Sequence, residues 1–137
     1  MDIAEAQIFL SQHHRGVLVT RKRDGALQMS PVSPALDNEG RVLVTSRETA
    51  YKIKNLRRDP RAALCVFTDA FHGSQWIQIS GRADILSLPE ALDPLIHWHR
   101  QVKGEHADWS EYRRTMEKQR RVALRIVIES AGPDKKG

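Results

Sequence analysis

The residues best suited to chemistry stand where a β-branched run, 41–46, gives way to a basic segment, 47–58. At this junction Thr45 and Ser46 offer hydroxyl groups and Arg47 offers a guanidinium group. The basic segment has helical spacing, and the first backbone N–H groups of a helix have no intrahelical acceptor and attract anions. The junction therefore predicts a site for an anionic group.

Two lysines compete for a place in this site. On a helical wheel Lys52 and Lys54 fall on opposite shoulders of the apolar face, so only one of them can lean into a given pocket. We expect Lys52, in line with Asn55, to be that residue. Thr45 and Glu48 have the spacing of a capping box, which would start the helix near residue 47. The alternative is a solvated basic helix with an ordinary cap.

Other residue types give weaker indications of a binding or catalytic site. Trp76 shares one face of an alternating stretch with Gln78 and Ser80, and its indole either covers a flat ring system or fills a half-buried place in a barrel. Cys65, in an apolar run, is expected to be a buried small side chain. The six histidines lack zinc-site spacing, and no P-loop, GxSxG or GxGxxG motif is present. We therefore expect no metal site and no catalytic acid or base.

Composition narrows the class of protein. The chain has 137 residues, 28% of them charged, and a net charge of +5, which indicates one folded domain that favours anionic partners. No nucleic-acid-binding motif accompanies the basic residues, so no nucleic-acid partner is expected. No apolar run reaches the roughly 18 residues of a membrane span, and no membrane partner is expected. A single cysteine and an N-terminus without a basic leader suit a reducing cytoplasm.

Hydrophobic periodicity predicts six strands, with four helices between and around them. The strands are expected over 16–21, 26–36, 41–46, 61–68, 75–86 and 121–129, and the helices over 4–12, 47–58, 89–103 and 109–119. Short connections between strands favour a mainly β fold, an antiparallel barrel or curled sheet. Pro31 and Pro34 exclude a regular central position for the second strand. We expect a single domain over 1–130 and a disordered tail over 131–137.

Four features follow one another along residues 5–128. They are a DG hairpin before a proline-bearing strand, the basic run from Lys52 to Arg61, the stretch from Trp76 to Gly81, and the segment 99–124. In this order they resemble the pyridoxamine 5′-phosphate oxidase-like split-barrel superfamily, and within it the branch that binds the deazaflavin coenzyme F420. The last segment is similar to a helical insert of one subgroup, known first from mycobacterial proteins.

The resemblance implies a six-stranded antiparallel split β-barrel that forms a homodimer, with two cofactor sites along the interface. The cofactor phosphate would lie against the turn after the third strand, and the deazaflavin ring on the second strand. The residues implied for cofactor binding are Gln28, Met29, Ser30, Pro31, Val32, Ser33, Thr45, Ser46, Arg47, Lys52, Asn55, Trp76 and Arg121. The chain differs from its subgroup relatives at Ala50, where they tend to carry a basic residue. Either the phosphate is bound more weakly here, or Arg47 takes the place of that basic residue.

The activity that the resemblance implies is that of an F420-dependent oxidoreductase. Such an enzyme moves hydride from the reduced deazaflavin to a small unsaturated organic substrate, and the cofactor rather than a side chain carries the chemistry. Two alternatives stay open. One is an FMN-binding flavoprotein of the same fold, and the other is a non-catalytic carrier of F420 or of a tetrapyrrole.

Overall fold

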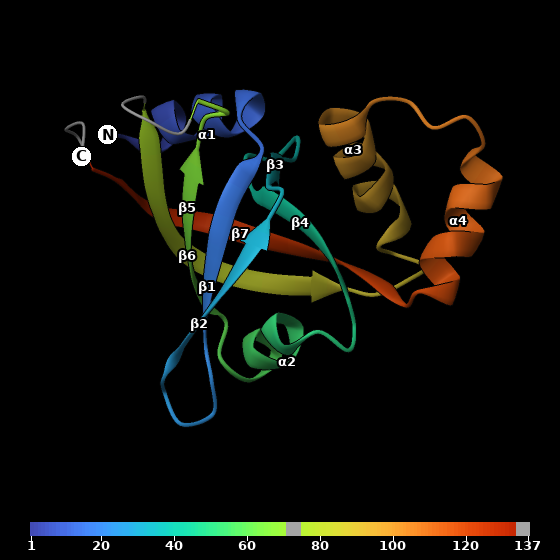
Figure 1. Ribbon diagram of the computed structural model, residues 1–137, viewed down its shortest axis with the longest axis horizontal. Helices are drawn as coiled ribbons and strands as arrows, with labels where there is room; N and C mark the ends of the chain where they lie inside the picture. Colours follow the sequence, from blue (N-terminus) through green and yellow to red (C-terminus); the bar gives the residue numbers. More distant parts are fainter. Residues whose placement is uncertain (71–74, 134–137) are drawn as a thin grey trace.

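The fold is a curled antiparallel sheet with helices at its ends and on one outer face (Figure 1). This computed structural model describes residues 1–70 and 75–133. Its elements are α1 (Ile3–Gln12), β1 (Arg15–Arg21), β2 (Leu27–Val32), β3 (Ala35–Leu36), β4 (Val42–Arg47), α2 (Tyr51–Arg58), β5 (Arg61–Phe67), β6 (Trp76–Leu86), α3 (Leu92–Lys103), α4 (Trp109–Lys118) and β7 (Arg121–Gly132). The sheet order is β2-β1-β5-β6-β7-β4-β3. The expected mainly β, antiparallel half-barrel is therefore confirmed.

Alternation along the strands builds the barrel interior. In β1 and β5, every second residue is buried, and the wholly buried side chains include Leu18 and Leu64. Ile77 and Ile79 of β6 point the same way, while Gln78 between them faces outward. Because side chains alternate between the two faces of a strand, each strand contributes one apolar row to the core. α1 and α2 close the two ends of this core with buried side chains of their own.

The expected number of six strands is wrong, because the second strand divides into β2 and β3. Residues 27–32 pair with β1, whereas Ala35 and Leu36 pair with β4 on the opposite edge of the sheet. Pro34 stands between the two pieces and has no N–H to donate to a ladder. The chain therefore leaves one partner strand and joins another at this point.

The expected start of the second helix near residue 47 is also wrong. Arg47 ends β4, and α2 begins only at Tyr51. The capping box between Thr45 and Glu48 does not form, because Thr45 is held in the β4–β7 ladder opposite Ala123. The helix instead follows a turn over residues 48–50 and has no side-chain cap.

α3 and α4 form a second layer on the outer face of β3, β4 and β7. Their buried side chains pack with Leu43 and Ala123 in a small separate core. Gln101 accepts the N–H of Leu36 at 2.8 Å and donates to its carbonyl oxygen at 2.9 Å. Trp98 donates its indole N–H to the Ser33 carbonyl at 2.7 Å. These bonds occupy backbone groups on the short edge strand β3 and beside it, which would otherwise be open to pairing.

A β-bulge bends the two longest strands, β6 and β7, where their register shifts between Ser80 and Gly81. A Cβ atom at Gly81 would lie 1.9 Å from the Val127 carbonyl oxygen, so only glycine allows this approach. β7 continues to Gly132, three residues beyond the expected end at 129. Ala131 and Gly132 thus belong to the sheet, and residues 134–137 of the expected tail lie outside the described residues.

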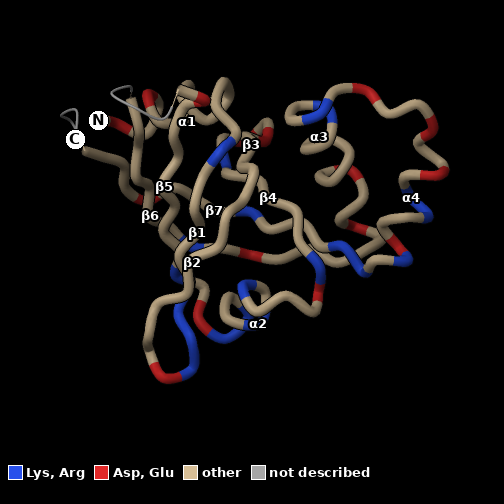
Figure 2. The backbone as a smooth tube through the Cα atoms, viewed as in Figure 1, with Lys and Arg blue, Asp and Glu red and all other residues tan. Residues whose placement is uncertain are grey.

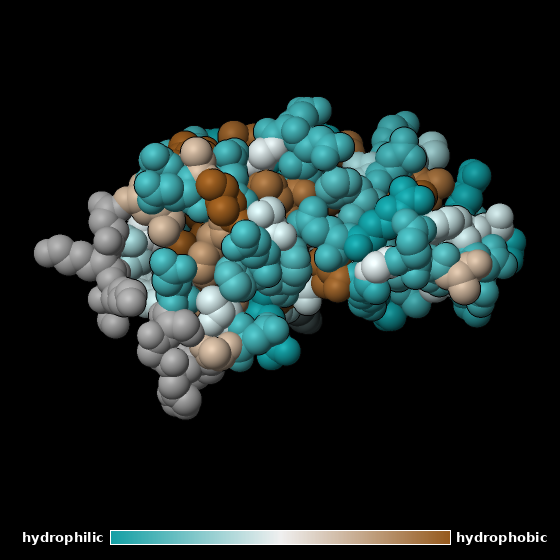
Figure 3. Space-filling view, turned by 90° about the horizontal axis from the view of Figure 1, so that it is seen from above, coloured by the Kyte–Doolittle hydropathy of each residue, from teal (hydrophilic) through white to brown (hydrophobic). Residues whose placement is uncertain are grey.

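Seen from above, hydrophobic side chains gather over the barrel, while the lobe of α3 and α4 is mostly hydrophilic (Figure 3). On α1, Ile3 and Ile8 are exposed apolar side chains, with exposed fractions of 38% and 62%. Over the part of the chain that the structure describes, no helix combines the length and the apolar character needed to cross a membrane.

Candidate functional site

An open cavity of about 280 Å³ lies where β4, the turn before α2, and β7 meet. Lys and Arg residues follow one another along α2 and occur where β4 leads to α2 and where α4 meets β7 (Figure 2). The cavity is lined by Thr45, Ser46, Arg47, Thr49, Ala50, Lys52 and Arg121. Five of these seven residues, all but Thr49 and Ala50, were predicted to bind the cofactor. Ala50 was noted only as the departure beside the phosphate, and Thr49 was not predicted because the turn at 48–50 was assigned to the helix.

The pairing of β4 with β7 sets two of the cations side by side. Arg47 is the direct partner of Arg121 in this ladder, and opposite residues of an antiparallel pair point to the same face. Burial lowers the pKa of Arg121, and the neighbouring Arg47 lowers it further. Among the described residues, no carboxylate lines the cavity, so these charges are not neutralised within it by residues 1–70 and 75–133.

Lys52 adds a third cation from the first turn of α2. Burial lowers the pKa of its amine, and Arg121 adds to the effect. Lys54 lies elsewhere: it is exposed, and its Nζ stands 5.7 Å from the centre of the Tyr51 ring. The structure therefore places Lys52, and not Lys54, in this cavity, which we call the Lys52 cavity.

Neutral donors complete the cavity wall. Thr45 Oγ1 is buried and has no hydrogen-bond partner among the described residues. α2 begins after Ala50, which offers no side-chain acceptor to the first N–H groups of the helix. Ala50 occupies the place where a basic residue was noted to be missing, and Arg47 lines the same cavity. Three cations, a free hydroxyl and an uncapped helix start form an arrangement that can bind a phosphoryl or carboxylate group.

Asn55 does not line the cavity. It is 6% exposed, and its amide nitrogen donates to Thr20 Oγ1 at 3.1 Å and to Gln28 Oε1 at 2.6 Å. Its amide oxygen accepts a hydrogen bond from Arg58 at 3.0 Å. Asn55, through Thr20 and Gln28, thus holds α2 against the end of β1 and the start of β2, which positions Lys52 indirectly.

The expected ring-binding stretch, residues 28–33, covers all of β2 but its first residue, together with Ser33, and β2 is one edge of the sheet. Gln28, Ser30 and Val32 are half-buried, whereas Met29, Pro31 and Ser33 are exposed. An edge strand leaves backbone N–H and carbonyl groups open along its outer side. β2 can therefore offer hydrogen bonds to a flat ligand, but it does not line the Lys52 cavity.

Trp76 is far from the cavity within one chain. Thr45 pairs with Ala123, and Ala123 pairs with Leu86, the last residue of β6. Trp76 is the first residue of the same strand, and ten residues of strand cover roughly 33 Å of backbone. Trp76 is half-buried on the outward face of the sheet.

Cys65 is half-buried on the same outward sheet face, not in the core. Burial raises the pKa of its thiol, which disfavours the reactive thiolate. Among residues 1–70 and 75–133, no group of His, Cys, Asp or Glu is arranged to hold a metal ion.

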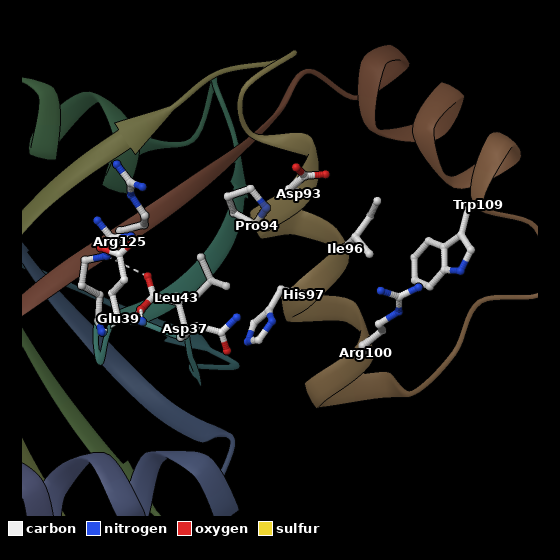
Figure 4. A pocket seen from close by; sticks show the side chains of 12 residues that line it. Asp37, Glu39, Leu43, Asp93, Pro94, Ile96, His97, Arg100, Trp109 and Arg125 are labelled. Atoms are coloured by element: carbon white, nitrogen blue, oxygen red, sulfur yellow. Dashed lines mark hydrogen bonds and ion pairs between the residues drawn. The ribbon is translucent and has the colours of Figure 1, made fainter.

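A larger cavity, about 700 Å³, lies between the turn after β3 and the helices α3 and α4 (Figure 4). Its arginines are neutralised by carboxylates. Arg41 binds Asp37 at 2.8 Å, and Arg100 binds Glu105 at 2.8 Å. Arg125 likewise donates to Asp84 at 3.0 Å. This cavity is larger than the Lys52 cavity, but its arginines are already paired with carboxylates and are therefore less suited to bind an anion.

Comparisons with known proteins agree with this fold. The chain is similar to the conserved hypothetical protein Rv2991 from Mycobacterium tuberculosis, with a TM-score of 0.78 at 24% identity over 100% of this chain and 92% of that one. It is similar to an F420 reductase, with a TM-score of 0.72 at 20% identity over 92% and 94% of the two chains. It is also similar to HutZ, the heme storage protein from Vibrio cholerae, with a TM-score of 0.71 at 16% identity over 96% and 94%.

At these identities the solved structures show the fold and leave the activity open. The family model for pyridoxamine 5′-phosphate oxidase matches residues 3–132 of this chain. Because that match spans nearly the whole sequence, the protein belongs to the pyridoxamine 5′-phosphate oxidase family.

Proposed function

We propose that the protein is an oxidoreductase that binds coenzyme F420 and uses it to reduce a small unsaturated organic substrate. The observation that carries this proposal is the cluster of Arg47, Lys52 and Arg121 around one cavity, whose lining has no carboxylate in the described part of the chain. Deazaflavin and flavin cofactors both carry an anionic phosphoryl group. The free hydroxyl of Thr45 and the uncapped start of α2 suit the oxygens of such a group.

A second cavity favours F420 over FMN. It measures about 290 Å³, adjoins the first through Arg121, and also contains Arg120. Its two carboxylates have other partners: Glu48 binds Arg57 at 2.7 Å, and Glu117 binds Arg113 at 3.2 Å. Two adjoining cavities that each contain arginines suit a ligand with two separate anionic groups. F420 has a phosphodiester and glutamate carboxylates, whereas FMN has a single phosphate.

A second copy of the chain is part of the proposal. The outward faces of four neighbouring strands carry a row of small or apolar residues, in which Met29 pairs with Val19 and Val19 with Ala63. Met29 is 66% exposed in the single chain. A contiguous apolar sheet face of this kind marks an interaction surface. Trp76, which opens the outward row of β6, would reach a cofactor only across such an interface.

The protein's part in the reaction is binding and orientation. When bound in its reduced form, F420 supplies the hydride for an electron-poor double bond. Arg47, Lys52 and Arg121 would hold the anionic end of the cofactor, and Asn55 would keep α2 in place behind Lys52. The outer edge of β2 would hydrogen-bond the ring. Holding both reactants in fixed geometry and excluding water would supply the rate gain.

The test is a titration of the purified protein with F420, followed by the fluorescence of the cofactor, with FMN titrated in parallel. We expect F420 to bind in the micromolar range or better and FMN to bind more weakly. Clear FMN binding without F420 binding would overturn the proposal. Oxidation of reduced F420 by a panel of enones, imines and quinones then tests turnover, and its absence across the panel would favour a carrier.

The interface is tested by Val19→Lys, which places a charge in the centre of the apolar sheet face. We expect this variant to remain folded, sediment as a monomer and lose F420 affinity. Ile8→Lys is the matched control, because Ile8 is 62% exposed on α1 and lies outside that face. A Val19→Lys variant that stays dimeric and binds F420 normally would exclude the proposed interface.

The FMN alternative rests on a specific feature as well. A phosphate monoester carries close to two negative charges at neutral pH, which also suits three cations around one cavity. The discriminating variant is Arg120→Gln, since Arg120 lines only the second cavity. A loss of F420 affinity with FMN affinity unchanged supports the two-anion ligand, and equal effects on both favour FMN.

A further inference from the structure

Lys52 differs from the other lysines of the described chain. Lys22, Lys54, Lys103 and Lys118 are exposed, whereas Lys52 is half-buried. Within residues 1–70 and 75–133, its amine has no carboxylate, carbonyl or ring as a partner. Its neighbours in the cavity are instead two guanidinium groups and the buried hydroxyl of Thr45. An amine in such surroundings lacks a counter-charge that would stabilise its protonated form.

These surroundings make the neutral, nucleophilic form of the amine easier to reach than in an exposed lysine. Burial lowers the pKa of Lys52, and the positive charge of Arg121 lowers it further. Lysines that form covalent adducts with carbonyl compounds are activated by the same two effects, desolvation and a neighbouring cation. Here the same cations also offer a binding place for an anionic group on the carbonyl compound.

We propose that Lys52 is a nucleophilic amine that forms an imine with small anionic aldehydes, whose anionic group is held by Arg47 and Arg121. The nitrogen lone pair of Lys52 adds to the carbonyl carbon, and the carbonyl oxygen gains a proton as the nitrogen loses one, which gives a carbinolamine. The hydroxyl group and the remaining N–H proton then leave as water, and a C=N bond forms. No oxidant or reductant is required.

This activity goes beyond the proposed cofactor function and rests on the cavity alone. Phosphorylated aldehydes are the chemical class that fits, because they carry a carbonyl carbon and a phosphoryl group on one short scaffold. The phosphoryl group of a redox cofactor would occupy the same cations. Cofactor and aldehyde are therefore expected to exclude each other.

The experiment uses the full chain and glyceraldehyde 3-phosphate, with cyanoborohydride to trap the imine and peptide mass mapping to find the labelled residue. Unphosphorylated glyceraldehyde is the control for anion recognition. We expect Lys52 to be labelled at least tenfold faster than any exposed lysine, and glyceraldehyde to lose that preference. Inorganic phosphate is expected to slow the labelling of Lys52 and of no other lysine.

Two variants complete the test. Lys52→Arg keeps the charge and should abolish the fast label, whereas Lys54→Arg, on the exposed side of the same helix, should leave it unchanged. Labelling spread evenly over the exposed lysines, or a fast label that persists in Lys52→Arg, would overturn the inference. Fast labelling without F420 binding would instead refute only the cofactor proposal, and Lys52-dependent F420 binding with even labelling would refute only the imine.

Discussion

Replacing Lys52 by methionine should change cofactor affinity and protein stability in opposite directions. The charge of Lys52 favours anion binding but destabilises the ligand-free protein. The amine faces Arg121 across a cavity without a carboxylate, so its charge opposes folding and supports anion binding. Methionine keeps the length and the apolar stem of the side chain. We therefore expect Lys52→Met to bind the cofactor more weakly and to be more stable without it.

The magnitudes follow from the environment of the amine. A hydrogen bond to a charged group contributes about 1.5–3 kcal/mol, which corresponds to a 10- to 150-fold increase in Kd on its loss. The repulsion relieved in the ligand-free protein is smaller, because the cavity is open and water screens the charges. We expect a gain of about 0.5–1 kcal/mol, or roughly 2–5 °C in Tm.

The pH dependence has a defined sign. The folded-state pKa of Lys52 is lowered, so the destabilising charge is fully present below that pKa and disappears as the pH rises toward the unfolded value near 10.5. The advantage of Lys52→Met in Tm should shrink over the same alkaline range. F420 affinity of the wild type should fall as the amine loses its proton, beginning below the pH expected for an ordinary lysine.

The assays are fluorescence titration with F420 and thermal unfolding without ligand, both from neutral to alkaline pH. Lys52→Arg is the matched control, since arginine stays charged throughout and should remove the alkaline loss of affinity. A Lys52→Met variant with unchanged affinity for both F420 and FMN would refute the assignment of the cavity. A variant that is less stable than the wild type would refute the electrostatic reasoning.

Three further substitutions test the scaffold. Asn55→Ala should lower the free energy of unfolding in urea by about 2–3 kcal/mol, because it removes three side-chain hydrogen bonds of a buried amide; a loss under 0.5 kcal/mol would contradict this. Arg120→Gly should raise the free energy of unfolding by up to about 1 kcal/mol, since Arg120 has a φ of 53°. A lower free energy of unfolding would show that contacts of the Arg120 side chain outweigh the backbone strain. Gly81→Ala should lower it by about 3 kcal/mol or more by forcing the Val127 carbonyl away; near-wild-type stability would show that the bulge adapts.

Much of the candidate site follows from local sequence. Thr45, Ser46, Arg47 and Lys52 lie within eight consecutive positions, so any fold that ends a strand and starts a helix there brings them close together. The preference for Lys52 over Lys54 follows from helical geometry, because the two side chains diverge by about 200° around the axis. The mainly β class follows from the two-residue alternation of the long strands.

The tertiary structure decided what depends on contacts between distant segments. The pairing of β4 with β7 placed Arg121 beside Arg47 and held Thr45 in the ladder, which left α2 uncapped. The ladder forms in place of the capping box that the local sequence predicts, because the ladder makes several backbone hydrogen bonds and the box makes only two. The inward turn of Asn55 toward Thr20 likewise required a buried polar group on another strand. Periodicity shows which side of a helix is buried, but only the packed fold shows which polar group on another strand hydrogen-bonds to a residue on that side.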